Sequence, residues 1–144
     1  MLFRSNSNLV TVKAIGSGSS NIYGETLDLA ATALVLQDKV APTLAQTSFD
    51  GAVLPHVAYT RATGVITLKF NEDIDPRTVY LLTFEVSNYG VDSIVAVGNE
   101  VRITIASADR NRVTAFDTVI QKFELRDLSG NGLNGLQMQI QKIY

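Results

Sequence analysis

The sequence predicts an all-β protein built as an antiparallel β-sandwich. Three observations carry this prediction. Apolar and polar residues alternate with a period of two through much of the chain, no convincing helical period is present, and turn clusters recur at intervals of roughly ten residues. Such alternation is typical of strands that bury one face in a core and turn the other toward solvent or a neighbouring molecule.

Four segments show the alternation most clearly, and in each the apolar positions predict the buried face. In the third of them, Val119, Phe123 and Leu125 are expected to point into the core, and the charged residues between them outward. The four segments are VITLKF (65–70), VRITIA (101–106), TVIQKFELRD (118–127) and LQMQIQKI (136–143).

Further apolar runs supply additional candidate strands. YLLTFEV (80–86) and VDSIVAV (91–97) lie within the same part of the chain, whereas LVTVKAI (9–15) and ALVL (33–36) precede it. The last of these has the weakest pattern, because only four residues carry it.

Turn residues between the candidate strands agree with this reading. Gly98 and Asn99 separate SIVAV from EVRITI, which predicts a two-residue hairpin loop with positive φ. Thr63 and Gly64 separate HVAYTR from VITLKF, and we expect the same kind of turn there. Other turn clusters lie at GSGSSN (16–21), FDG (49–51), NEDIDP (71–76), SNYG (87–90) and LSGNGLNG (128–135).

A change of composition at DKVAPTL (38–44) marks the predicted domain boundary. Pro42 cannot donate a ladder hydrogen bond, and proline often stands at the entry to a strand. We therefore predict that residues 1–40 form an N-terminal β extension that supplies assembly strands, and that residues 41–144 form the sandwich.

Composition narrows the classes of function. The net charge is −2 and no basic run is present, which argues against a nucleic-acid partner. The absence of cysteine excludes disulfides, thiol nucleophiles and cysteine-ligated zinc. No stretch reaches the ~18 apolar residues of a membrane helix, so membrane insertion is not expected. Charged residues make up only 18%, so either polar uncharged residues cover the exposed strand faces, or part of the surface is buried against other subunits.

The acidic segment FNEDIDPRT (70–78) could be a turn, a cation site or a catalytic cluster. Asp75 precedes Pro76, and proline fixes φ near −65°, which favours a turn. Asp and Asn side chains bond nearby backbone groups in turns, which explains the acidic residues without a ligand. A calcium site needs about 6–8 oxygens, and this segment supplies too few. We interpret it as a turn.

The segment DLSGNG (127–132) resembles the opening of an EF-hand loop. Asp127, Ser129 and Asn131 have the spacing of the first ligands, but the twelfth position is Met138 instead of a bidentate Glu. A strand pattern follows where the EF-hand has a helix. We interpret this segment as a turn as well.

No catalytic constellation is predicted. His56 is the only histidine, and the nucleophile-elbow pattern GxSxG is absent. The serines of GSGSS (16–20) have no lysine at phosphate-loop spacing. The tyrosines suit a core edge or an interface better than a sugar-stacking platform, since the chain has no tryptophan.

Several turn motifs together resemble the bacterial Ig-like domains of surface-layer and adhesin proteins. That family opens with a D-x-x-A-P linker, continues with a strand ending in F-S/N-E and a D-P turn, and then has a V-x-G-N/D-x-V hairpin and a D-x-S/A-G-N turn. The resemblance covers residues 41–144 and implies an Ig-like antiparallel β-sandwich used as a non-catalytic spacer, adhesive or assembly module. The matching residues are 38–42, 70–76, 97–103 and 126–131.

Three functions stay open from the sequence. The first is a structural subunit of a larger assembly, a phage virion component such as a capsid decoration or tail protein, with protein subunits as partners. The lack of a visible targeting segment in MLFRSNSNLV favours this virion location. The second is an Ig-like module of a bacterial surface-layer, filament or adhesin protein at the cell surface. The third is a carbohydrate-binding module with a glycan ligand. None is an enzyme, and no cofactor or metal is expected.

Overall fold

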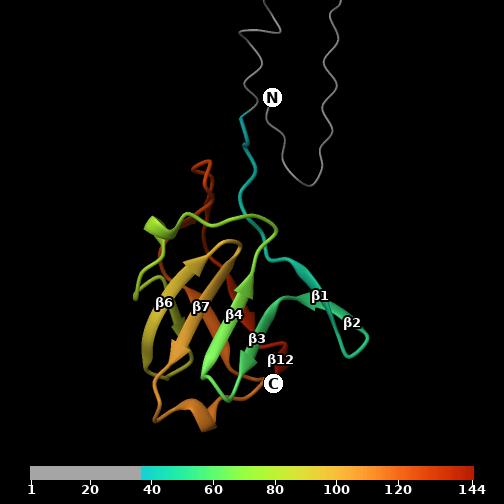
Figure 1. Ribbon diagram of the computed structural model, residues 1–144, viewed down its shortest axis with the longest axis vertical. Coiled ribbons are helices and arrows are strands. Elements are labelled where there is room, and N and C mark those ends of the chain that lie inside the picture. The colour runs from blue at the N-terminus through green and yellow to red at the C-terminus, as the bar shows by residue number, and fades with distance from the viewer. Residues whose placement is uncertain (1–36) are drawn as a thin grey trace, which may run out of the picture. The chain divides into compact units, whose positions relative to one another are not determined.

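The structure of this protein is a computed structural model that describes residues 37–144 (Figure 1). The sandwich forms one compact unit, Val40–Tyr144. The predicted N-terminal β extension, including LVTVKAI (9–15) and ALVL (33–36), lies outside the described residues, so both that extension and the predicted boundary at residue 40 stay predictions.

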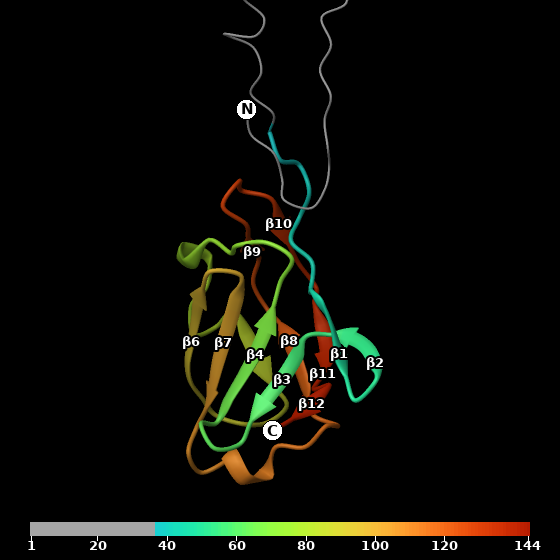
Figure 2. The ribbon, with the colours of Figure 1, turned by 45° about the vertical axis from the view of Figure 1, so that its right-hand side comes forward.

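The described residues form an all-β sandwich, as predicted (Figures 1 and 2). One layer is a five-stranded sheet in the order β12-β3-β4-β7-β6, and the other is a three-stranded sheet in the order β11-β8-β5. All neighbours pair antiparallel except β12 and β3, which are parallel. The strands are β3 (Val57–Thr60), β4 (Val65–Lys69), β5 (Phe84–Val86), β6 (Val91–Val97), β7 (Glu100–Ile105), β8 (Thr118–Gln121), β11 (Gln137–Gln139) and β12 (Lys142–Ile143).

Within residues 37–144, two small ribbons and two short helices complete the fold. The hairpin of β1 (Gln46–Phe49) and β2 (Ala52–Pro55) precedes the five-stranded sheet, and β9 (Leu125–Arg126) pairs with β10 (Gly132–Leu133). The 3-10 helices are η3 (Pro76–Thr78) and η4 (Arg110–Arg112). The sequence predicted the turn of the β1–β2 hairpin at FDG but not its strands, since QTSF and AVLP show no clear alternation.

The alternation in β4 and β7 defines the core. Ile66 lies opposite Ile103, and Leu68 lies opposite Val101, and all four side chains are fully buried. Their neighbours along each strand, such as Arg102, turn outward. The period of two therefore predicted the buried face of this central strand pair correctly.

The segment 118–127 departs from its predicted pattern. Val119 and Leu125 are buried as expected, but Phe123 is 48% exposed, and Gln121 is buried instead. The Gln121 amide donates to the carbonyl oxygens of Phe123 and Leu133 and accepts from the backbone N–H of Leu136. One buried side chain thus satisfies three backbone groups. The strand pairing is interrupted between β8 and β9, and the Phe123 side chain points toward solvent.

The predicted single strand 136–143 is two strands in different sheets. β11 pairs with β8, and β12 pairs with β3 across the sandwich. Ile140 lies buried between them, and the Gln141 N–H donates to the carbonyl of Val57 (2.8 Å). The final strand therefore crosses from one layer to the other.

The predicted strand YLLTFEV (80–86) is shorter than expected, since only Phe84–Val86 forms a strand.

The two predicted tight turns differ from each other. Gly98 has φ +61°, as expected for a two-residue loop between β6 and β7. The loop between β3 and β4 spans four residues (61–64), and Gly64 (φ +72°) donates its N–H to Thr60 O. The prediction of a second two-residue turn was wrong, because β3 ends before Arg61.

Candidate functional site

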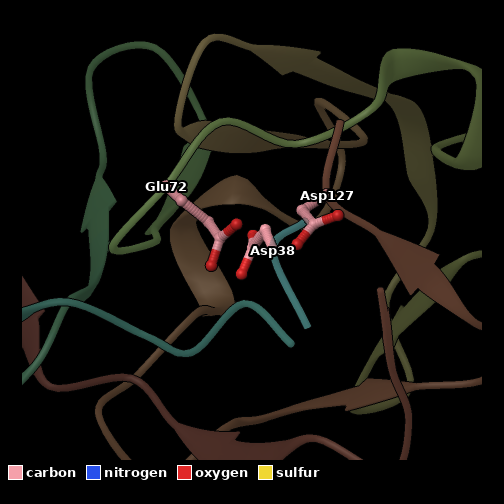
Figure 3. Close-up of side chains that lie close together, drawn as sticks. All are labelled: Asp38, Glu72 and Asp127. Carbon is pink, nitrogen blue, oxygen red and sulfur yellow. The ribbon is translucent and has the colours of Figure 1, made fainter. Parts of the chain in front are cut away.

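The two acidic turns that the sequence presented separately meet in the structure. Glu72 comes from FNEDIDPRT and Asp127 from DLSGNG, and Asp38 brings a third carboxylate to them (Figure 3). One carboxylate oxygen from each residue lies within 4.8 Å of the others. Sequence analysis did not predict this meeting. The D-x-x-A-P pattern drew attention to Asp38, but a single sequence does not show which turns lie next to one another in the fold.

Backbone pairing positions the two turns. Ile74 forms an isolated antiparallel bridge with Asp127, and the Asp75 N–H donates to Arg126 O (2.8 Å). These contacts hold the segment after β4 against the end of β9. On the other side, Thr43 N–H donates to the Asn71 side chain (2.9 Å), and Asn71 N–H donates to Thr43 O (2.9 Å). Glu72 thus lies between two fixed backbone contacts.

Asp127 organises its own turn. Its Oδ1 accepts from the N–H groups of Ser129 (2.8 Å) and Asn131 (2.9 Å), and its Oδ2 accepts from the Asn131 side chain (2.9 Å). Burial raises the pKa of Asp127, but hydrogen bonds from Asn131, Glu72 and Ser129 outweigh that effect, so the pKa of this carboxyl lies below its ordinary value. The residues that matched EF-hand ligand positions bond to one another, which agrees with a turn.

Asp75 has a similar structural role in the other turn. It caps η3 by accepting the Arg77 N–H (3.0 Å), and both of its carboxylate oxygens accept from the Arg77 guanidinium. These hydrogen bonds from Arg77, aided by its charge, lower the pKa of Asp75. The Asp-Pro sequence therefore builds a capped turn, as interpreted from the sequence.

The three-carboxylate group has a limited capacity for a cation. Ca²⁺ takes about 6–8 oxygen ligands, and three carboxylates reach that number only with backbone or water oxygens added. Both lone pairs of Asp127 Oδ1 already accept N–H donors. Glu72, Asp127 and Asp38 are the described residues that could hold a hard cation, and the expectation that neither turn binds a metal strongly stays a prediction.

His56 and the tyrosines have structural contacts. His56 Nδ1 lies 2.8 Å from Thr47 Oγ1, and its ring packs on Phe49 with centroids 5.3 Å apart. Burial, reinforced by the charge of Lys69, lowers the pKa of His56. Tyr89 donates from its hydroxyl to Arg112 O (3.0 Å). These contacts hold the β1–β2 hairpin and the loop after β7 in place.

A group of exposed apolar side chains lies beside β5. Leu81 and Leu82 are both more than half exposed, and they line one shallow depression together with Phe123. The rings of Tyr80 and Phe123 lie with centroids 5.7 Å apart. We call Tyr80, Leu81, Leu82 and Phe123 the apolar patch. The outward-facing ring of Phe123 contributes to this patch.

Comparisons with known proteins do not identify this chain. No family model matches it, and neither the curated proteins nor the solved structures include a significant match. Within residues 37–144, no helix is long and apolar enough to cross a membrane.

Proposed function

We propose that this protein is a non-catalytic structural subunit of a larger assembly, a phage virion component such as a capsid decoration or tail protein. The apolar patch is the observation that carries the proposal. Contiguous apolar side chains on the surface of a soluble domain mark sites where another molecule binds. Here Leu82 is 62% exposed and Leu81 51%, next to the short edge strand β5.

The use of the acidic residues supports a structural role. The carboxylates of Asp75 and Asp127 both accept backbone and side-chain hydrogen bonds within their turns. A general base needs a carboxylate that can reach a substrate proton. Groups already committed to holding turns are poorly suited to that task.

Removal of residues 1–24 tests the proposal. All the strands of the described sandwich lie between residues 46 and 143, so we expect the shortened protein to keep its circular dichroism spectrum. We also expect it to fail to join its particle or polymer, because the removed segment contains LVTVKAI (9–15), which could add as a strand to a neighbouring subunit.

Two results would count against the proposal. Normal incorporation of the shortened protein would remove the assembly role of the N-terminal region. Absence of the full-length protein from purified particles of its source would remove the structural role altogether. Mass spectrometry of those particles shows whether the full-length protein is present. The Leu82→Ser variant tests the apolar patch in the same incorporation experiment.

A further inference from the structure

β6 is the longest free edge among the described strands. It lies at one end of the five-stranded sheet (Figure 1), and β7 is its single partner there. It has 7 residues, whereas β5 and β11, the edges of the other sheet, have 3 each, and β12 has 2. A long free edge offers a row of backbone donors and acceptors to another extended chain.

The register with β7 shows which backbone groups point outward. Val97 and Glu100 close the two-residue loop, so this pair exchanges both of its hydrogen bonds. Hydrogen-bonded pairs recur at every second residue, so Val95 and Ser93 also bond to β7. The N–H and C=O groups of Ile94 and Ala96 therefore point away from β7.

The side chains of β6 do not protect this edge. The strand VDSIVAV has no lysine and no proline, the residues that commonly block edge strands. Val95 and Val97 are 48% and 49% exposed on its outer face. A bulge between Val91 and Ser93 interrupts the regular ladder, so the usable edge is 93–97.

We propose that β6 pairs antiparallel with β6 of a second copy of this chain, with Val95 opposite Val95 of the partner subunit. Ile94 then lies opposite Ala96 of the partner subunit, and Ala96 opposite the partner's Ile94. Each of these two pairs exchanges both backbone hydrogen bonds, and the five-stranded sheets of the two copies become continuous. This inference rests on the proposed function, because it names one contact of the assembly.

The two neighbouring registers are less favourable, each for a different reason. A register centred on Ala96 would need the Gly98 carbonyl, which accepts from Ile74 N–H (2.9 Å). A register centred on Ile94 would draw Asp92, next to the bulge, into the ladder. The register centred on Val95 uses only uncharged residues, and it buries the exposed valine against its own copy. A two-fold contact of this kind is closed, so it yields a dimer rather than a fibre.

Single-cysteine variants test the register, and the natural chain contributes no cysteine of its own. In the proposed dimer, two Val95→Cys residues face each other as a non-hydrogen-bonded pair with Cα atoms about 4.5 Å apart, which suits a disulfide. We expect mild oxidation of the full-length variant to give a covalent dimer that reductant reverses. Val97→Cys is the matched control, since its copies would lie about 13 Å apart and should not cross-link.

A mixture of the Ser93→Cys and Val97→Cys variants should form a disulfide between one copy of each, because position 93 of one subunit lies opposite position 97 of the other in the proposed register. No dimer from Val95→Cys overturns the inference. Equal cross-linking by Val97→Cys alone also overturns it, because that result indicates random collision.

Sedimentation of the full-length protein over a concentration series tests the contact without cysteine. Val95→Lys places two ammonium groups opposite each other and should shift the protein from dimer to monomer, whereas Val95→Thr should keep the dimer. The proposed register places Asp92 opposite Gly98 of the partner subunit, and Gly98 has Asp73 beside it. These two carboxylates repel each other, so added salt should strengthen the dimer. A wild-type protein that stays monomeric throughout overturns the inference. Because purified protein is used, this failure is distinct from absence from particles, which concerns the proposed function.

Discussion

The hydroxyl of Tyr59 donates a hydrogen bond to the carbonyl oxygen of Arg110 over 2.8 Å, linking β3 to η4. Tyr59 is fully buried in the core. The same end of the molecule is closed by Arg61, whose guanidinium donates to the carbonyl of Val113 (3.2 Å). The loop after β7 is therefore held by side chains of β3 and of the turn that follows it.

Tyr59→Phe should lower the free energy of unfolding by about 1 kcal/mol, the usual net contribution of one hydrogen bond. The Arg110 carbonyl keeps a weak contact with Arg61 (3.4 Å), so the loss should not be much larger. Urea denaturation measures the change. Tyr144→Phe is the control, because Tyr144 is exposed, and it should leave the midpoint unchanged. Equal effects of the two substitutions would contradict a specific role for the Tyr59 hydroxyl.

Gly98→Val should destabilise the β6–β7 hairpin by roughly 1 kcal/mol or more, since a β-branched residue resists positive φ. Asn99→Gly should also be destabilising, although glycine suits a tight turn. Asn99 Nδ2 donates to Phe70 O (2.9 Å), and the loss of this bond should cost about 1 kcal/mol. Thermal melts of both variants measure these losses, and Asn99→Gly with wild-type stability would refute the side-chain contribution.

Asp127 should contribute to acid sensitivity. Its folded-state pKa lies below the ordinary value of 3.8, so its ionised form stabilises the fold above that pH, and this stabilisation is lost as the pH falls through the folded pKa. Asp127→Asn should therefore be less stable at neutral pH and should lose less stability on acidification. Denaturant midpoints between neutral pH and about pH 2 measure both effects. Asp50→Asn, which breaks only an exposed pair with Lys142, is the control and should keep the wild-type pH profile.

Calcium should stabilise this protein little. Millimolar Ca²⁺, compared with a chelator, should raise the melting temperature by no more than a few degrees, because stabilisation by a ligand grows as RT ln(1 + [L]/Kd) and a weak site has a large Kd. The Glu72→Gln variant should respond as the wild type does. A large, saturable rise that Glu72→Gln abolishes would show instead that the three-carboxylate group is a cation site.

The sequence alone determined the strand faces and the turns wherever a few adjacent residues decide them. The buried residues of β4 and β7 follow from alternation, and the bounds of β6 coincide with VDSIVAV. The positive φ at Gly98 follows from turn chemistry. Such features depend on side-chain direction and backbone preference, which are properties of neighbouring residues.

Tertiary structure decided the features that depend on contacts distant in the chain. Gln121 is buried in place of Phe123 because its side chain hydrogen-bonds the carbonyl of Leu133 and the N–H of Leu136. The last strand changed sheets because the edge of β3 was available to pair with it. Glu72 and Asp127 met because Ile74 bridges Asp127, and no local pattern encodes that neighbour. Buried backbone groups must find hydrogen-bond partners, and only the packed chain determines where those partners are.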